Sequence, residues 1–299
     1  MRGGELFYYD SERDADSERD ADYKSDNNII NNNINKQTIA LIHGLSDEAD
    51  TWRHIFPLLI GAGYRVIAPD LPGFGRSNWK GRITMRGHRD AVIRLLAETG
   101  AASAKQPAAL VGSSLGAGIA EMAACRRPDL VKALVLIGGC FPFAGSRGSG
   151  FSLLGLPVIG TSWYRSFRSN HEAAWKSLYP YYGDLDGMSD ADKDFLRERV
   201  IARVESANQE RGYFATLRSM NALFFFGDKA LTRKIQTFAG KIVLLWGKQD
   251  NVFPPEKAAV FRSLRPDAGF TQIDNAGHLP HQEKPDATAS EIIRFLKKE

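Results

Sequence analysis

The sequence predicts an α/β fold: a mostly parallel, doubly wound sheet with a helical lid inserted after the strand that ends near Gly139. Five apolar runs, each followed by glycine, serine or aspartate, alternate with helix-like segments: TIALIHG, YRVIAPD, PAALVGSS, VKALVLIGG and KIVLLWG. Near-continuous apolar strands of this kind are typical of parallel sheets covered by helices on both faces. Amphipathic spacing around residues 88–96 and 292–296 predicts two of these covering helices.

The lid is predicted from the point where this alternation stops. Residues 140–236 begin with a glycine- and phenylalanine-rich apolar loop and continue as aromatic-rich amphipathic helices. Open α/β sheets bind their ligands at the carboxyl ends of the strands, so an insertion after a strand can cover that edge. The apolar loop is too short to span a bilayer. We therefore expect it to pack in the lid or core, although contact with lipid is the alternative.

The chain of 299 residues is long enough for one large domain with an insertion. We expect the core to comprise residues 38–139 and 237–299, the lid residues 140–236, and an N-terminal segment residues 1–37. The N-terminal segment contains the acidic repeat SERDAD-SERDAD and an asparagine-rich stretch, which we expect to be partly disordered because they are poor in apolar residues. The preceding LFYY resembles a short strand, so the acidic segment is either a tail or a long loop between strands.

Composition excludes several classes of function. Lysine and arginine are scattered along the chain, which does not indicate a nucleic-acid partner. The two cysteines, Cys125 and Cys140, lack the spacing of a metal or redox site. The sequence shows no signal-peptide pattern and no apolar run that could cross a bilayer, so we expect a cytoplasmic protein without stable membrane insertion. Its oligomeric state is left open.

The motif that carries chemistry is Gly112-Ser113-Ser114-Leu115-Gly116, between the strand PAALV and a helix-like segment. A serine on a tight strand-to-helix turn is exposed at a helix N-terminus, where the free N–H groups favour negative charge. We expect Ser114 to be a nucleophile. A second glycine-containing turn, His43-Gly44-Leu45, ends the strand TIALI. The N–H groups of Leu45 and Leu115 are the expected oxyanion hole, and His43 is expected to hold its loop.

A serine nucleophile needs an imidazole to take its proton and a carboxylate to orient that imidazole. Asp250 follows the strand KIVLLWG, and His278 lies in the loop NAGHLPH. Together with Ser114 they stand in the order serine, aspartate, histidine. His281 and Asp274 are the nearby competitors. His281 is expected to pack or cap, and Asp274 is too close in sequence to His278 to reach it from another strand.

These motifs resemble the α/β-hydrolase fold superfamily, in its esterase, C–C hydrolase and haloperoxidase-like branch. The matching stretches are LIHGLSDEADTW, YRVIAPDLPGFGRS, LVGSSLGAGIA, LVLIGG, VLLWGKQDNVFP and NAGHLPHQEKP. The resemblance implies Ser114 as nucleophile, His278 as general base and acid, and Asp250 as its orienter. It also implies a mainly structural role for residues 70–77. Two features depart from the pattern: little sequence is left for the usual first hairpin, and Leu279 stands where ring-fission C–C hydrolases carry tryptophan.

We therefore expect a carboxylic ester hydrolase that cleaves an ester-like bond of a small, largely apolar molecule through an acyl-enzyme intermediate. The mechanism needs neither a metal nor an organic cofactor. An aspartate nucleophile, as in related dehalogenases and epoxide hydrolases, is excluded by Ser114. Two alternatives stay open: a receptor-type relative that binds a ligand with slow or no turnover, and a C–C hydrolase or perhydrolase that uses the same triad.

Overall fold

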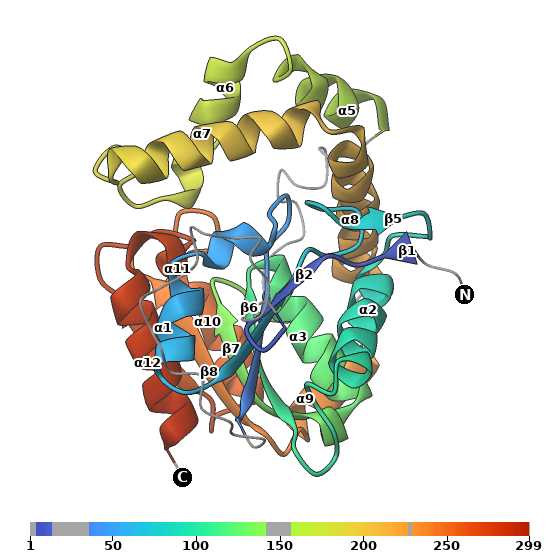
Figure 1. The fold of residues 1–299 in the computed structure, drawn as a ribbon, viewed down its shortest axis with the longest axis vertical. Helices are drawn as coiled ribbons and strands as arrows, with labels where there is room; N and C mark the ends of the chain where they lie inside the picture. Colours follow the sequence, from blue (N-terminus) through green and yellow to red (C-terminus); the bar gives the residue numbers. More distant parts are fainter. Residues whose placement is uncertain (1–3, 14–35, 142–156, 227–228, 299) are drawn as a thin grey trace.

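A seven-stranded sheet forms the centre of the protein (Figure 1). The computed structural model describes residues 4–13, 36–141, 157–226 and 229–298. Most of the acidic repeat, the asparagine-rich stretch and most of the apolar loop after Gly139 lie outside these residues. The sheet has the order β2-β4-β3-β6-β7-β8-β9. Its strands are β2 (Tyr8–Asp10), β3 (Thr38–Ile42), β4 (Arg65–Pro69), β6 (Ala108–Ser113), β7 (Val131–Ile137), β8 (Lys241–Gly247) and β9 (Gly269–Ile273).

Six of these strands are parallel, and only the edge strand β2 is antiparallel to its neighbour β4. The side chain of Arg65 on β4 donates two hydrogen bonds to the carboxylate of Asp10 on β2. The N-terminal segment therefore contributes a strand to the main sheet. A separate two-stranded sheet pairs β1 (Gly4–Glu5) with β5 (Asn78–Trp79).

Side chains of the central strands alternate between two apolar layers. On β3, Ala40 and Ile42 pack in the layer that also contains α2 (Met85–Glu98), α3 (Leu115–Arg126) and α10 (Ala258–Leu264). Ile39 and Leu41 pack in the layer that contains α1 (Ile55–Gly61) and α12 (Pro285–Lys297). Both faces of the sheet are covered, which explains why the central strands β3, β6, β7 and β8 are apolar at most positions.

The described residues between β7 and β8 form helices joined by turns and irregular loops, and no strand lies among them. It contains α5 (Pro157–Ser166), α6 (His171–Lys176), a 3-10 turn (Tyr179–Tyr181), α7 (Asp190–Glu205), α8 (Ala207–Phe226) and α9 (Lys229–Gln236). Figure 1 shows α5, α6 and α7 across one end of the molecule, whereas α8 runs down beside α2. His88 on α2 is hydrogen-bonded to Thr216 on α8 at 2.8 Å. The inserted helices thus lie in two places: α5, α6 and α7 across one end of the molecule, and α8 beside α2.

Candidate active site

Ser114 lies on the sharp turn between β6 and α3, with a φ angle of 53°. This is the left-handed region, which a non-glycine residue adopts only when its surroundings enforce it. The surroundings here are crowded: a Cβ atom on Gly116 would lie 2.1 Å from the carbonyl oxygen of Ile42. Since only glycine permits that contact, Gly116 lets α3 begin directly against the end of β3.

His278 and Asp250 form a buried hydrogen-bonded pair. Nδ1 of His278 donates to Oδ2 of Asp250 at 2.8 Å. The other carboxylate oxygen, Oδ1, accepts the backbone N–H groups of Val252 and Phe253 at 2.9 and 2.8 Å. Because both carboxylate oxygens are occupied, the orientation of Asp250 is fixed. A proton on Nδ1 leaves Nε2 of His278 as the basic nitrogen.

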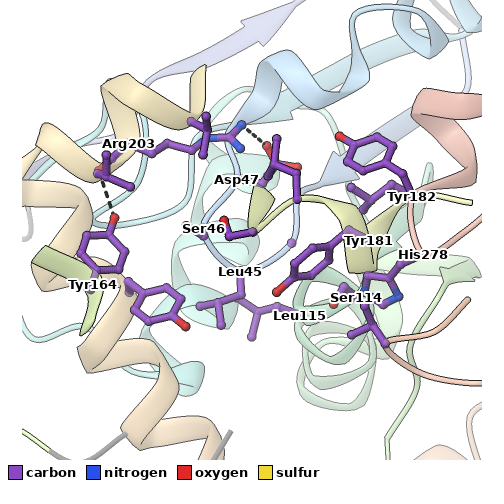
Figure 2. Close-up of a pocket in the computed structure, with 18 of the residues that line it drawn as sticks. Leu45, Ser46, Asp47, Ser114, Leu115, Tyr164, Tyr181, Tyr182, Arg203 and His278 are labelled. Carbon is purple, nitrogen blue, oxygen red and sulfur yellow. Dashed lines mark hydrogen bonds and ion pairs between the residues drawn. The ribbon is translucent and has the colours of Figure 1, made fainter. Parts of the chain in front are cut away.

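Ser114 and His278 face the same cavity and lie next to each other in Figure 2. Two glycines after β7 pack closely against these two residues. A Cβ atom on Gly138 would lie 3.1 Å from Nδ1 of His278, and one on Gly139 would lie 2.9 Å from the carbonyl oxygen of Ser114. Nε2 of His278 has no hydrogen-bond partner among the described residues. The hydrogen bond between a nucleophile and its base is often long in a site without substrate and shortens when substrate binds.

Two backbone N–H groups are placed to hold an oxyanion. Leu115 is the first residue of α3, where N–H groups have no helical partner. Leu45 follows β3 in a turn in which the N–H of Asp47 donates to the carbonyl of Gly44 and Ser46 has a φ angle of 64°. Leu45 and Leu115 both line the cavity. Neither N–H is hydrogen-bonded to another part of the described chain.

The remaining residues that the sequence singled out are engaged elsewhere. Nε2 of His43 accepts the N–H of Leu71 at 2.8 Å and its Nδ1 donates to the carbonyl of Gly44, so it holds the loop as predicted. Nε2 of His281 lies 3.0 Å from Oγ1 of Thr51. Asp274 is exposed and pairs with Lys248. Neither competitor therefore occupies the place of His278 or Asp250.

Burial of His281 predicts how stability depends on pH. Burial, partly offset by the charge of Asp47, lowers the pKa of His281 to about 3. In the unfolded chain the imidazole of residue 281 binds a proton below about pH 6.5, whereas in the folded protein it stays neutral until about pH 3. Acid therefore favours unfolding between these two pH values. We expect His281→Asn to reduce the slope of unfolding free energy against pH by about 1.4 kcal/mol per pH unit between about pH 6 and pH 4.

Urea unfolding of wild type and variant at several pH values measures this slope. The matched control is His171→Asn, which replaces a solvent-exposed imidazole on α6. The control should keep the wild-type slope. Identical slopes for wild type and His281→Asn would contradict the assignment of a neutral, buried imidazole.

The cavity has a volume of about 170 Å³ and is mostly apolar. Its described lining comes from the ends of the strands and from the inserted helices α5, α7 and α8. Aromatic and aliphatic side chains predominate: Leu45, Leu115, Trp163, Tyr164, Phe167, Leu178, Tyr181, Tyr182, Val200, Val204, Tyr213, Met220, Val252, Phe253 and Leu279. A pocket of this kind with a few polar groups is a typical small-molecule site.

One polar contact in the cavity could not be found from the sequence. Arg203 on α7 pairs with Asp47 in the loop after Leu45, at 2.5 Å (Figure 2). Burial raises the pKa of Asp47, but the charge of Arg203, together with smaller contributions from neighbouring groups, holds the pKa below its ordinary value. The hydroxyl of Tyr164 donates to the carbonyl of Arg203 at 3.0 Å. Through these contacts the inserted helices are tied to the loop that carries Leu45.

Breaking this ion pair is expected to destabilise the fold. Arg203→Met should lower the free energy of unfolding by about 3–5 kcal/mol, because it leaves the Asp47 carboxylate buried without its cation. The matched control is Arg199→Met on the same helix, whose guanidinium lies 3.5 Å from Glu48 and Asp50 and is more exposed. Arg199→Met should lower the free energy of unfolding by less than about 1 kcal/mol. Urea titrations compare the two variants, and equal losses would contradict the argument.

No group of three histidine, cysteine, aspartate or glutamate side chains within the described ranges is arranged to hold a metal ion. Across the same ranges, no helix combines the length and apolar character needed to cross a membrane.

The geometry and the comparison with known proteins define the class. Residues 37–285 match the family described as alpha/beta hydrolase fold. The chain belongs to this family and is a hydrolase of the α/β type.

Curated relatives include hydrolases of different substrates. The chain is 28% identical to 2-hydroxy-6-oxo-6-(2'-aminophenyl)hexa-2,4-dienoic acid hydrolase of Metapseudomonas resinovorans, over 88% of this chain and 84% of that protein. It is 24% identical to Lipase 1 of Psychrobacter immobilis, over 89% and 78%. Its fold is similar to that of a thermophilic esterase from Thermogutta terrifontis, with a TM-score of 0.71 and 20% identity over 98% of this chain and 93% of the other.

Proposed function

We propose that the protein is a serine hydrolase that cleaves an ester-like bond of a small, largely apolar molecule through an acyl-enzyme intermediate. The observation that carries the proposal is the convergence of Ser114, the His278–Asp250 pair and two free N–H groups on one apolar cavity. Each element meets one need of acyl transfer: a nucleophile, an oriented base and donors for the oxyanion.

The reaction follows from these positions. Nε2 of His278 takes the hydroxyl proton as Oγ of Ser114 attacks the carbonyl carbon of the substrate. The N–H groups of Leu45 and Leu115 stabilise the negative oxygen of the tetrahedral intermediate. His278 then gives its proton to the departing alcohol, which leaves the acyl group on Ser114. Water, deprotonated by the same imidazole, attacks the acyl-enzyme; the imidazolium then returns the proton to Oγ of Ser114 as the acid is released.

The charge of the cavity favours an ester over the anionic substrate of a C–C hydrolase. Arg203 is the one lysine or arginine among the described residues that line the cavity, and its charge is neutralised by Asp47. A carboxylate-bearing dienoate entering here would meet no free cation from this part of the chain. Burying its charge unpaired would be costly. The proposal also treats the helices α5 to α7 as a lid over the site.

The test is a turnover screen with para-nitrophenyl esters of increasing acyl length, beside a 2-hydroxy-6-oxo-dienoate, on wild type and Ser114→Ala. The proposal expects rapid multiple turnover of esters that depends on Ser114 and little cleavage of the dienoate. Preferential cleavage of the dienoate would favour the C–C hydrolase. Ligand-dependent thermal stabilisation with less than one turnover per site would favour a receptor.

A further inference from the structure

Tyr181 connects the inserted helices to the candidate base. Its carbonyl accepts the backbone N–H of His278 at 2.8 Å, and its ring lies 5.9 Å from the imidazole. Its side chain lines the cavity, and Figure 2 shows its hydroxyl directed toward Leu45 and Leu115. The phenol therefore stands beside the place where the acyl group of a substrate would lie.

Four tyrosines among the described residues line the cavity, and their hydroxyls fall into two groups. Tyr164 donates to the carbonyl of Arg203, and Tyr182 donates to Oε1 of Gln282 at 2.9 Å. The hydroxyls of Tyr181 and Tyr213 make no hydrogen bond to any residue in the described ranges. Two phenols in this cavity thus have unused donors and acceptors.

Both phenols are held in place and stay protonated. The ring of Tyr213 packs against the rings of Tyr164 and Phe214, with centroids 5.3 and 5.0 Å away. Burial raises the pKa of Tyr181 and, helped by the neighbouring Tyr181 phenol, that of Tyr213. A protonated, positioned phenol is a hydrogen-bond donor that loses little freedom on binding.

A substrate with a purely hydrocarbon acyl chain would displace water from these hydroxyls without replacing the hydrogen bonds that the water made. Buried polar groups left without partners weaken binding, and a site built around such groups discriminates against analogues that lack the matching atom. An oxygen in the acyl chain would accept the donated hydrogen bonds.

We propose that Tyr181 and Tyr213 bind a second oxygen of the substrate, so that the preferred substrates are esters with an ether or hydroxyl oxygen in the acyl chain close to the scissile carbonyl. This inference rests on the proposed ester hydrolysis and narrows its substrate class. In this proposal Tyr181 and Tyr213 determine substrate specificity, and their hydrogen bonds to the second oxygen are present both in the bound substrate and in the transition state.

A matched pair of substrates tests the proposal: para-nitrophenyl valerate and para-nitrophenyl methoxypropanoate, in which an ether oxygen replaces one methylene of the acyl chain. The measured quantity is the ratio of kcat/KM for the methoxy ester to that for valerate. Tyr181→Phe and Tyr213→Phe should each lower this ratio about three- to tenfold relative to wild type, the size of one hydrogen bond. Both variants keep the ring and, at position 181, the carbonyl that binds His278.

The control is Tyr164→Phe, because its hydroxyl is already bonded within the protein. This variant should keep the wild-type ratio whatever it does to absolute rates. A ratio that stays within about twofold of wild type in Tyr181→Phe and Tyr213→Phe would overturn the proposal.

A binding measurement separates this inference from the ester hydrolysis on which it rests. Calorimetry on Ser114→Ala, with and without Tyr181→Phe, measures the affinity for each ester in the absence of turnover. The ratio of the affinity for the methoxy ester to that for valerate is then compared between the two proteins. If wild type hydrolyses neither ester but the affinity ratio falls with Tyr181→Phe, the proposed function fails and the oxygen site stands. If both esters are hydrolysed and neither ratio changes, the oxygen site fails alone.

Discussion

Ser114→Ala is expected to lower kcat on an activated ester by about three to six orders of magnitude. The alanine methyl cannot attack a carbonyl, and the remaining activity would come from the Leu45 and Leu115 N–H groups and from binding of the substrate. The measurement is steady-state hydrolysis of a para-nitrophenyl ester by purified variant and wild type. KM should change far less than kcat, because the hydroxyl contributes little to ground-state binding.

The neighbouring serine provides a matched control. Ser113 ends β6, is buried, and its hydroxyl has no hydrogen-bond partner among the described residues. Ser113→Ala should therefore keep wild-type kcat within a small factor. If Ser114→Ala kept more than about a tenth of wild-type turnover, the nucleophile would have to be another group.

Asp250→Asn is expected to lower kcat by about four orders of magnitude, with stability less affected. Oδ1 of Asp250 accepts two backbone N–H groups, so the asparagine carbonyl oxygen would take that position. Its NH₂ group would then face Nδ1 of His278 and force the imidazole proton onto Nε2. In that tautomer Nε2 cannot accept the proton of Ser114.

The control for Asp250→Asn is Asp274→Asn, which changes an exposed carboxylate in the loop before His278. It should leave kcat near that of wild type, because Asp274 is exposed and pairs with Lys248 on the surface. Loss of activity in Asp274→Asn, with Asp250→Asn active, would reverse the assignment of the orienting carboxylate. Thermal unfolding of both variants shows whether any loss of rate comes from loss of fold.

The sheet and the order of its candidate site residues were predictable because they depend on local patterns. Strands buried on both faces are apolar at nearly every position, so runs such as PAALV and KIVLLWG stand out in the sequence. A parallel sheet places the carboxyl ends of its strands along one edge. Residues that follow different strands, such as Ser114 and Asp250, therefore come together although about 136 positions separate them.

The N-terminal strand was ambiguous from the sequence. Tyr8–Asp10 are too few residues to predict a strand by alternation alone. In the structure, pairing with β4 and the bonds from Arg65 to Asp10 place them in the sheet. These contacts join residues that are 55 to 61 positions apart.

The inner surface of the cavity depends on contacts that no local pattern records. Arg203 meets Asp47 across 156 positions of sequence, and Tyr181 meets His278 across nearly a hundred. A helix periodicity reveals which side of α7 or α8 is apolar, but not which surface that side will cover. Residue order and turn chemistry thus defined the hydrolase class and the candidate triad. The orientation of the inserted helices, set by long-range packing and ion pairing, decided which side chains line the cavity.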